Sequence, residues 1–393
     1  MAPTTDVDPF STEVLADPLP WQSWLREAGP LVRLARYDAH VMGRYDEVRA
    51  ALADWQRFQS AAGVGVANFL TEEPWRPPSL LLEADPPHHD APRAVLSRIL
   101  GPRALRRLRQ AWFADAEALV DEVVSEGELD AVTDLAQVFP LRVFPDAVGL
   151  GERGREHLLP YGDFAFNAFG PHNDLVQRGT EGIGEHSAWV GEQCRRESLA
   201  PGGFGAAIWA AADRGELTRE QAQLVVRSLL TAGVDTTVHG IGAVLHAFAT
   251  NPAQWRRLRD DPGSARTAFD EAVRWESPVQ TFFRTTTEPV EIGGERLPAG
   301  AKVMMSLASA NRDPRRWHRP DEFDSSRDPS GHLGFGMGIH QCVGQHIARL
   351  ESEALLTALA RRVTDIELAG EPVRHLNNTL RAWESLPIRI TSR

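Results

Sequence analysis

The feature that most constrains the fold is a long apolar segment, residues 218–250, whose pattern predicts a single buried helix. Thr218, with Gln221 three residues later, has the form of a capping box, and Asn251-Pro252 supplies the stop. At about 1.5 Å per residue such a helix spans ~50 Å, enough to cross a whole domain. Its apolar residues face several directions, which is typical of a helix buried on all sides. We therefore expect a mainly α protein built around this helix.

The rest of the chain also has a mainly helical pattern. Helical spacing of apolar residues covers residues 92–125, with a break at Gly101-Pro102, and residues 133–150, 152–168 and 177–196. Strand-like segments are short and fall at residues 31–36, 39–43, 290–292 and 302–306. This order predicts a helix-rich protein with small peripheral β-sheets. No internal repeat and no long linker divides residues 1–393, which we expect to form one domain.

Composition excludes several classes of function. The net charge of −12 leaves no basic excess with which to neutralise the phosphates of nucleic acid. Two cysteines in 393 residues exclude a disulfide framework and indicate a reducing compartment. The N-terminus lacks the pattern of a signal peptide, and no run of about 18 apolar residues predicts a membrane span. We expect a cytoplasmic protein that meets its substrate and its partners in solution.

The segment AGVDTT (232–237) places an acid and two hydroxyl groups in the middle of the buried helix, where they are costly unless they form hydrogen bonds. One interpretation is that Thr236 bonds to the carbonyl four residues earlier and bends the helix. The other is a local opening beside a ligand, in which Asp235 and Thr236 handle protons and water. Gly233 has no side chain and would let a flat ligand approach closely. The residues alone leave both interpretations open.

The segment FGMGIHQCVG (335–344) carries a second chemical signal, and it precedes a helical run over residues 345–361. A thiolate at Cys342 would be stabilised by the free amides and the dipole of that helix. Such a thiolate can ligate haem iron. Zinc is disfavoured, because Cys342 has no CxxC partner and His340 alone completes no site. We interpret Cys194 as an ordinary buried thiol.

With these segments and two others, the chain resembles the bacterial cytochrome P450 family along nearly its whole length. FGMGIHQCVG is similar to the family's haem-binding signature, and AGVDTT to its oxygen-activation motif. EAVR (271–274) matches the ExxR helix, and NRDPRRWHRPDEFD (311–324) matches the stretch that leads to the haem loop. The resemblance implies a haem-thiolate monooxygenase with haem b, Cys342 as the axial iron ligand and O2 as co-substrate. It gives Glu271 and Arg274 a structural role in supporting the haem loop.

The resemblance also implies which residues surround the haem. The haem propionates would pair with His89, Arg93, Arg284 and His340. Five further positions are assigned to the cofactor site: Phe335, Gly336, Gly344, Ala232 and Gly233. Asp235 would relay protons from solvent, and Thr236 would hold the hydrogen bond to water beside the reacting oxygen.

A closer resemblance concerns the substrate. RPPSLLLEADPP (76–87), FNAFGP (166–171), ESPVQTFFRTTT (276–287) and NNTLR (377–381) resemble the subfamily that oxidises para-substituted benzoates, notably 4-methoxybenzoate, by O-demethylation or hydroxylation. The resemblance implies that the substrate carboxylate is held by Arg76, Ser79, Arg227 and Ser228. It implies that the aromatic ring is packed by Leu82, Phe166, Phe169, Thr231, Val279 and Phe282. Ala165 and Thr231 replace a valine and a serine of the subfamily, so we expect them to reshape the pocket.

Electrons must come from separate proteins, because the chain contains no flavin or iron–sulfur motif. The resemblance implies a monomeric enzyme that takes electrons from an acidic [2Fe-2S] ferredoxin, which a separate NAD(P)H ferredoxin reductase reduces. Six arginines and no acidic residue lie in residues 93–109. We expect four of these arginines to steer the ferredoxin: Arg98, Arg103, Arg106 and Arg107.

Three other functions are compatible with the cysteine motif. The first is a cytochrome P450 that oxidises a terpenoid, a macrolide or a fatty acid; the second is a peroxygenase that uses hydrogen peroxide directly. The third is a haem redox or gas sensor without turnover. The arginine and serine pairs at 76/79 and 227/228 argue against a large neutral substrate, and retention of Asp235-Thr236 disfavours the peroxygenase and the sensor.

Overall fold

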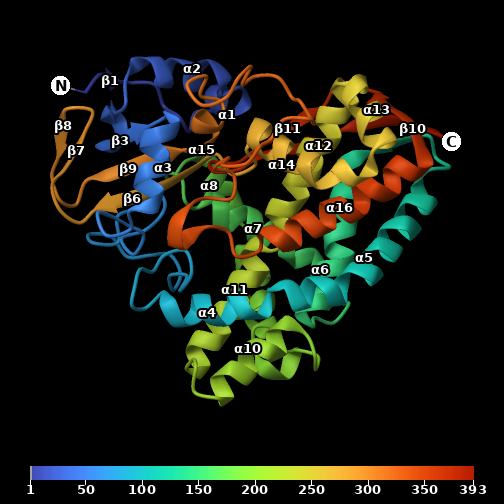
Figure 1. Ribbon diagram of the computed structural model, residues 1–393. Coiled ribbons are helices and arrows are strands. Elements are labelled where there is room, and N and C mark those ends of the chain that lie inside the picture. Colours follow the sequence, from blue (N-terminus) through green and yellow to red (C-terminus); the bar gives the residue numbers. More distant parts are fainter. Residues whose placement is uncertain (1) are drawn as a thin grey trace.

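The structure is a computed structural model that describes residues 2–393. In the view of Figure 1, most helices lie to the right and below, and the strands of the largest sheet lie to the left. The α-helices are α1 (Thr12–Ala16), α2 (Leu19–Ala28), α3 (Tyr45–Ala53), α4 (Asp90–Ile99), α5 (Pro102–Val123), α6 (Val138–Val148), α7 (Leu158–Asn167), α8 (Asp174–Thr180), α9 (Ile183–Gln193), α10 (Phe204–Asp213), α11 (Arg219–Ala232), α12 (Asp235–Thr250), α13 (Pro252–Asp260), α14 (Ala265–Glu276), α15 (Leu307–Asn311) and α16 (Gln345–Arg362). Shorter helical turns are η1 (Ala35–Tyr37), η2 (Ala131–Ala136), η3 (Arg155–His157), η4 (Arg196–Ser198), η5 (Pro262–Ser264) and η6 (Gly338–His340). Within residues 2–393, none of these helices combines the length and the apolar character that a membrane crossing requires.

The strands form one mixed sheet and three small antiparallel sheets. They are β1 (Thr4–Thr5), β2 (Val32–Leu34), β3 (Ala39–Met42), β4 (Phe58–Gln59), β5 (Glu128–Asp130), β6 (Thr281–Thr286), β7 (Val290–Ile292), β8 (Glu295–Leu297), β9 (Lys302–Ser306), β10 (Val363–Leu368), β11 (Val373–Leu376), β12 (Arg381–Ser385) and β13 (Pro387–Ser392). The mixed sheet has the order β1-β2-β3-β9-β6-β4, and the others are β10-β13-β5, β11-β12 and β7-β8. The parallel pairing of β3 with β9, which sets His40 opposite Val303, joins the start of the chain to its last third.

The predicted mainly α architecture with small sheets is confirmed, but residues 218–250 do not form one helix. The capping box is present, because the Thr218 hydroxyl accepts from the amide of Gln221 at 3.1 Å and the Gln221 side chain accepts from the amide of Thr218 at 2.9 Å. The chain leaves helical geometry at Gly233 and Val234, so α11 and α12 are separate helices. The strands β6 and β10 to β13 were not predicted, because each has at most six residues and mixes apolar with charged or hydroxyl side chains.

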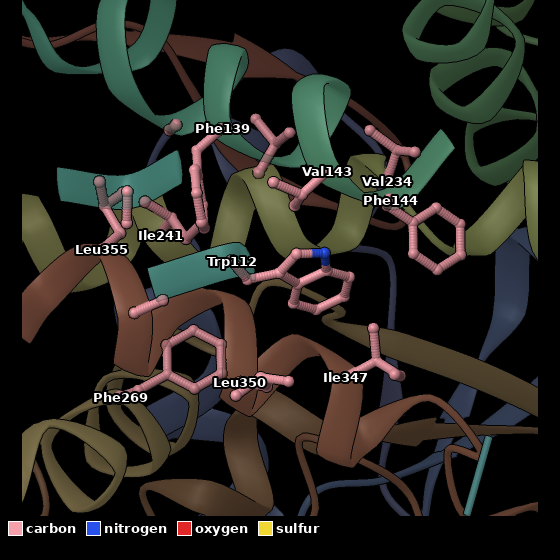
Figure 2. Close-up of a cluster of buried hydrophobic side chains, with 14 of the residues drawn as sticks. Trp112, Phe139, Val143, Phe144, Val234, Ile241, Phe269, Ile347, Leu350 and Leu355 are labelled. Atoms are coloured by element: carbon pink, nitrogen blue, oxygen red, sulfur yellow. The ribbon is translucent and has the colours of Figure 1, made fainter. Parts of the chain in front are cut away.

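The main core lies where α12 passes between two other groups of helices (Figure 2). Phe139 of α6 approaches α12 from one side, and Trp112 of α5 lies between α12 and α16. Phe269 of α14 and Leu350 of α16 approach from the other, and Ile241 of α12 lies between them. All five side chains are buried. Contacts on opposite sides explain why the apolar residues of α12 face several directions, and they fix where α12 begins.

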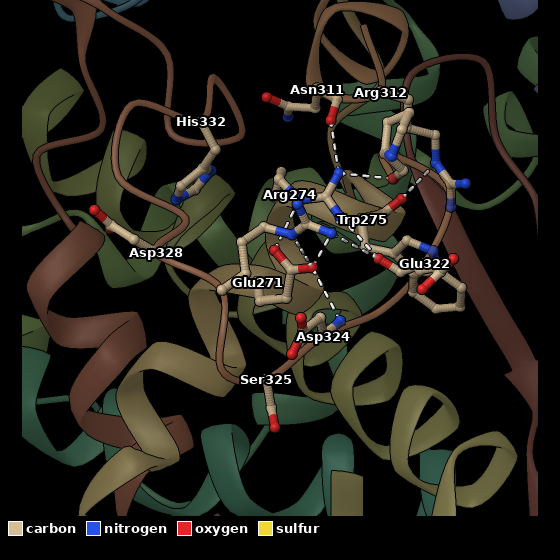
Figure 3. A network of polar contacts seen from close by, with 12 residues as sticks. Glu271, Arg274, Trp275, Asn311, Arg312, Glu322, Asp324, Ser325, Asp328 and His332 are labelled. Carbon is tan, nitrogen blue, oxygen red and sulfur yellow. Dashed lines mark hydrogen bonds and ion pairs between the residues drawn. The ribbon is translucent and has the colours of Figure 1, made fainter. Parts of the chain in front are cut away.

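A second constraint is a buried polar network around Arg274 (Figure 3). Nε and Nη2 of Arg274 donate to the two carboxylate oxygens of Glu271 at 2.7 and 2.8 Å. Nη1 donates to the backbone carbonyls of Asn311 at 2.8 Å and Pro320 at 2.9 Å. Arg327 donates to the same carboxylate at 3.0 Å. Side chains of α14 therefore clamp the segment 311–327 that leads to the cysteine loop, which is the supporting role expected of Glu271 and Arg274.

Replacing Glu271 with glutamine should lower the free energy of unfolding by about 3–5 kcal/mol, because two buried guanidinium groups would lose their carboxylate. Urea or thermal unfolding measures this change. The exposed pair Arg319–Glu322 has the same i, i+3 spacing, so Glu322→Gln is a matched control whose effect should stay within about 1 kcal/mol. Equal effects of the two substitutions would contradict the structural role of the buried pair.

Candidate active site

A largely apolar cavity lies between the α11–α12 junction and the loop that precedes α16. Most of the residues assigned to the site from the sequence line this cavity: Arg76, Ser79, Leu82, Arg93, Phe166, Phe169, Ser228, Thr231, Ala232, Gly233, Thr236, Val279, Phe282, Arg284, Phe335, Gly336, His340, Cys342 and Gly344. The remaining three, His89, Arg227 and Asp235, are placed behind its walls. The structure thus gathers residues from helices α4, α7, α11 and α12, from strand β6 and from several connecting loops around one space.

The loop before α16 presents the thiol of Cys342 to the cavity. Gly336 has a φ of +69°, a left-handed conformation that favours glycine, and it lets the loop turn back. The amide of Cys342 donates to the carbonyl of Phe335 at 2.8 Å and closes this turn. Burial raises the pKa of the thiol, while hydrogen bonds from the amides of Gly344 and Gln345, at the start of α16, act in the opposite direction. The loop therefore presents the sulfur to the cavity, with His340 of the same loop beside it in the lining.

The edge of the cavity near α4 carries one histidine and two arginines that lack an anion. Burial and the charges of His340 and Arg93 lower the pKa of His89. Neither ring nitrogen of His89 has a hydrogen-bond partner, and the nearest carboxylate, that of Asp90, lies 3.7 Å from Nδ1. Arg93 follows one helical turn later and lines the cavity. Arg284 is fully buried and donates to a neighbouring carbonyl at 2.8 Å, and burial lowers its pKa to about 10. Such donors are costly in an interior unless an anion binds them, so this edge suits an anionic group.

His340 differs from the other three predicted propionate partners, because both of its ring nitrogens are engaged. Nδ1 lies 3.0 Å from the carbonyl of Leu81, and Nε2 lies 3.2 Å from a carboxylate oxygen of Asp85. Asp85 also accepts from the amides of Ser60 and Ala61, both at 2.8 Å. Burial raises the pKa of Asp85, but these hydrogen bonds outweigh it, so the pKa is lowered. His340 therefore holds two loops together, and it must release one partner to bind a propionate.

The junction of α11 and α12 combines the hydrogen bond of the first interpretation of the AGVDTT segment with the local helix opening of the second. The helix opens at Gly233 and Val234, and the Thr236 hydroxyl donates to the carbonyl of Ala232 at 2.9 Å. Gly233 lines the cavity together with Ala232 and Thr236. A Cβ atom at Gly233 would lie 2.3 Å from the ring of Phe144, so packing against the core also requires a glycine here. That Gly233 makes room for a flat ligand stays a prediction.

Asp235 and Thr236 are neighbours in sequence but face opposite sides of α12. Thr236 lines the cavity, whereas Asp235 is 4% exposed and lies outside the lining. An oxygen of Asp235 lies 3.1 Å from Nε2 of His239, one helical turn later. Asp235 can therefore exchange protons with the cavity only across the helix, by way of Thr236 or of water.

Behind the polar wall of the cavity lies an acid, Glu83, that the sequence analysis did not identify. Arg76 lies 3.9 Å from the carboxylate of Glu83, and both side chains are buried. Glu83 accepts from the amide of Ser79 at 2.8 Å. The hydroxyls of Ser79 and Ser228 lie 3.1 Å apart, and Ser228 donates to a carbonyl of α11 at 3.0 Å. Arg76 in the cavity wall therefore already faces the negative charge of Glu83.

Arg227 does not take the predicted place beside the substrate. Its Nη2 donates to the carbonyl of Pro77 at 2.6 Å, behind the loop that carries Arg76 and Ser79. Burial and the nearby charge of Arg76 lower the pKa of Arg227. Ala165 is buried and also lies outside the lining, so Thr231 alone of the two departures from the subfamily changes the cavity wall.

The aromatic wall is built as expected. The rings of Phe166 and Phe169 meet edge to face with centroids 5.8 Å apart, and Phe169 meets Phe282 at 6.1 Å. Leu82 and Val279 pack against the same cluster. Edge-to-face packing fixes each ring against its neighbour, so these residues form a rigid apolar surface.

The residues present fit a haem group. The thiol of Cys342 faces the cavity and can act as the axial ligand. The unpartnered nitrogens of His89 and the buried guanidinium of Arg284 supply donors for anionic propionates. Cys194 has none of these surroundings, since it is buried and burial raises its pKa to about 12.

Comparison with known proteins identifies the class. A family model described as cytochrome P450 matches residues 205–364. A cytochrome P450 of Rhodopseudomonas palustris (strain ATCC BAA-98 / CGA009) is 56% identical over 390 residues, which cover 99% of this chain and 95% of that relative. The chain therefore belongs to the cytochrome P450 family. It is a monooxygenase that uses haem with a thiolate ligand and O2, and it depends on redox partners for electrons.

The relative from Rhodopseudomonas palustris is named CYP199A2. The cytochrome P450 monooxygenase PikC of Streptomyces venezuelae is 33% identical over 400 residues, covering 98% of this chain and 94% of PikC. Among solved structures, cytochrome P450 CYP109Q5 from Chondromyces apiculatus superposes with a TM-score of 0.83 at 30% identity and covers all of both chains. The likeness thus extends over essentially the whole chain.

Replacing His89 with leucine should speed the loss of haem to a scavenger protein by ~10–100-fold, because one charge-assisted hydrogen bond is worth about 1.5–3 kcal/mol. The exposed neighbour His88 is a matched control, and His88→Leu should change the rate by no more than about 2-fold. The decay of the haem absorption band measures both rates. Equal rates for the two variants would contradict a role of His89 in holding haem.

Proposed function

We propose that this cytochrome P450 oxidises a small aromatic carboxylate, with 4-methoxybenzoate undergoing O-demethylation and related para-substituted benzoates undergoing hydroxylation. The observation that carries the proposal is the charge of the polar wall. Arg76 brings one buried positive charge to the wall of an apolar cavity, and behind the same loop Arg227 adds a positive charge and Glu83 a negative one. One positive charge remains, which a substrate monoanion would neutralise.

The apolar part of the cavity supports the same substrate class. Phe166, Phe169 and Phe282 offer a rigid aromatic surface to one flat ring. A small aromatic acid needs such walls together with a few placed donors. A large neutral terpenoid or macrolide would leave the positive charge at the polar wall unpaired, which costs free energy.

We assign the axial thiolate to Cys342. When haem is bound, its thiolate-held iron activates O2, so that one oxygen atom enters a C–H bond and the other leaves as water. Oxidation of a methoxy carbon gives a hemiacetal, which releases formaldehyde and leaves 4-hydroxybenzoate. The chain's part is to hold the carboxylate at the polar wall so that the para substituent points toward the haem beside Thr236.

In this proposal, Thr236 and Asp235 deliver the protons that the reaction consumes. The Thr236 hydroxyl donates its proton to the carbonyl of Ala232, so its oxygen is free to accept from a water molecule in the cavity. Asp235, behind the wall, supplies protons to that water. Thr236 acts beside the reacting oxygen, and Asp235 acts from behind the wall through Thr236 and water.

4-Methoxybenzoate should convert the haem iron from low to high spin, and it should bind ~10–100-fold more tightly than neutral 4-methoxybenzamide, because a charge-assisted hydrogen bond contributes about 1.5–3 kcal/mol. Arg76→Gln should remove most of this preference. Optical titration measures both. Arg57, which is exposed and paired with Asp54, gives the control Arg57→Gln, which should bind both ligands as the wild type does. A response to a bulky neutral terpenoid, with none to the benzoate, would overturn the substrate assignment.

We further propose that an acidic [2Fe-2S] ferredoxin, reduced by a separate reductase in the cytoplasm, docks at the start of α5. Of the four arginines expected there, Arg98 pairs with Glu216 at 2.6 Å, and Arg107 donates to a carbonyl at 3.2 Å. The exposed side chains of Arg103 and Arg106 have no hydrogen bond or ion pair within residues 2–393. Their positive charges are thus available to an acidic partner.

Two ion pairs between α5 and α16 connect the proposed ferredoxin surface with the Cys342 loop, and they support the proposal. Arg109 of α5 bonds to Glu353 of α16 at 2.6 Å, and Arg361 of α16 pairs with Glu117 of α5. These pairs hold α5 along the helix that begins directly after the Cys342 loop. A partner bound at the start of α5 therefore lies on the thiol side of the cavity.

Reversing both charges, Arg103→Glu with Arg106→Glu, should raise the ferredoxin KM about 10-fold and weaken its dependence on salt, because steering by exposed charges is screened by ions. Steady-state turnover at several ionic strengths measures this, and the spin-state titration with substrate should be unchanged. Arg33→Glu, at an exposed arginine of β2, is the control. Turnover that responds neither to salt nor to the reversed charges would contradict the docking site.

A further inference from the structure

Asp235 is buried in a position that the cavity does not reach. It is the first residue of α12, it is 4% exposed, and its Oδ2 has no hydrogen-bond partner. Nε2 of His239 lies 3.1 Å from Oδ1, at an angle that makes no hydrogen bond, and this nitrogen is also without a partner. The buried carboxylate and the buried imidazole make no hydrogen bond to each other, so each keeps an atom that can accept or donate a proton. A residue that supplies protons must itself be resupplied from water.

The backbone of α7 covers Asp235 on the side away from the cavity. Gly162 sits against it so closely that a Cβ at Gly162 would lie 3.0 Å from the Cβ of Asp235. The next residue of α7, Asp163, accepts a hydrogen bond from Nε2 of His375 at 2.7 Å. Nδ2 of Asn377 donates to the same carboxylate oxygen at 2.8 Å and thereby holds it. The side chain of His375, on β11, is 37% exposed. An acid and an imidazole therefore lead from the back of Asp235 to solvent.

The side chains of Asp235, His239, Asp163 and His375 interact electrostatically. Burial raises the pKa of Asp163, but the hydrogen bond and the charge of His375, with a further contribution from His239, outweigh it and lower the pKa. The hydrogen bond to Asp163 raises the pKa of His375 against the effect of burial, and the charges of Asp235 and Glu384 act in the same direction. Glu384, on the paired strand β12, is thus the one further acid that bears on His375. Two acids and two imidazoles alternate in this cluster.

We propose that His375, Asp163 and His239 form a path that carries protons from solvent to Asp235. The proposal rests on the proton role given to Asp235 above. A water proton binds the free Nδ1 of His375, and the proton on Nε2 passes to the Asp163 carboxylate. Asp163 passes a proton to the His239 ring, directly or through one water molecule, and Nε2 of His239 passes one to Asp235. Each transfer breaks one N–H or O–H bond and forms another, so one proton enters for each proton that Asp235 delivers.

In this path His375, Asp163 and His239 are positioning residues, because they act on the reaction through Asp235. His375→Gln keeps a side-chain N–H donor for Asp163 but cannot carry a proton through its ring. The rate of product formation should fall about 5–10-fold with the substrate KM unchanged, and the solvent isotope effect in D2O should rise. Asp163→Asn should do the same, and Asp163→Glu should restore much of the rate. His172→Gln, at an exposed histidine that precedes α8, is the matched control and should behave as the wild type.

A measurement without turnover tests the cluster itself. An NMR titration of the histidine rings in the haem-loaded protein should give His375 a pKa above its ordinary value, and Asp163→Asn should lower it by about one pH unit or more. An unchanged His375 pKa in Asp163→Asn, or wild-type rates in both His375→Gln and Asp163→Asn while Asp235→Asn is slow, would overturn the path and leave the role of Asp235 intact. Wild-type rates in Asp235→Asn would overturn the role of Asp235 and the path together.

Discussion

The buried contacts of Arg274 are the interaction on which the rest of the site depends. One guanidinium satisfies the Glu271 carboxylate and reaches backbone carbonyls of a segment that begins at Asn311. Asn311 in turn accepts from the amide of Leu333 through its side chain at 2.7 Å. The clamp therefore extends from α14 to the residue two positions before Phe335, where the cysteine loop starts. This network and the turn at Gly336 set the position of the cysteine loop, together with the packing of Phe335, Met337 and Val343 against the core.

The second constraint is the break between α11 and α12. Directly after it, Thr236 and Asp235 face two different sides of α12. In a continuous helix, adjacent side chains are separated by roughly 100° around the axis. Opening the chain at Gly233 and Val234 leaves Thr236 on the cavity wall and turns Asp235 toward α7. The ring of Phe144 fills the space beside Gly233, so the break is held by the core and does not need a ligand to keep it open. The acid is thereby kept out of the apolar cavity, where a charge would oppose the binding of an anionic substrate.

The motifs predicted the cysteine loop, the ExxR clamp and most of the cavity wall, because each depends on residues close together in sequence. What could not be predicted depends on contacts between distant segments. Glu83 and Asp85 stand in the same loop as other acids, and nothing in their spacing tells which one faces Arg76 or His340. The contact of Asp163 with His375 joins residues from α7 and β11, which no local pattern relates. Arg227 was misplaced for the same reason, since only the path of residues 76–79 decides whether it faces the cavity or the back of that loop.

The two acids of the loop 76–87 also change how the charges of the site must be counted. Glu83 compensates Arg76 on the substrate side, and Asp85 engages His340 on the cofactor side. The motifs alone give two arginines at the substrate end of the cavity and two arginines with two histidines at the cofactor end, which suggests a strong attraction for any anion. With both acids included, the substrate wall keeps one net positive charge, from Arg76 and Arg227 against Glu83. A single uncompensated charge in an apolar surrounding discriminates between a monoanion and a neutral ligand, whereas a wall with several would also retain the anionic product. Under the proposed function, the acids of this loop therefore favour both selection of a carboxylate and its release after reaction.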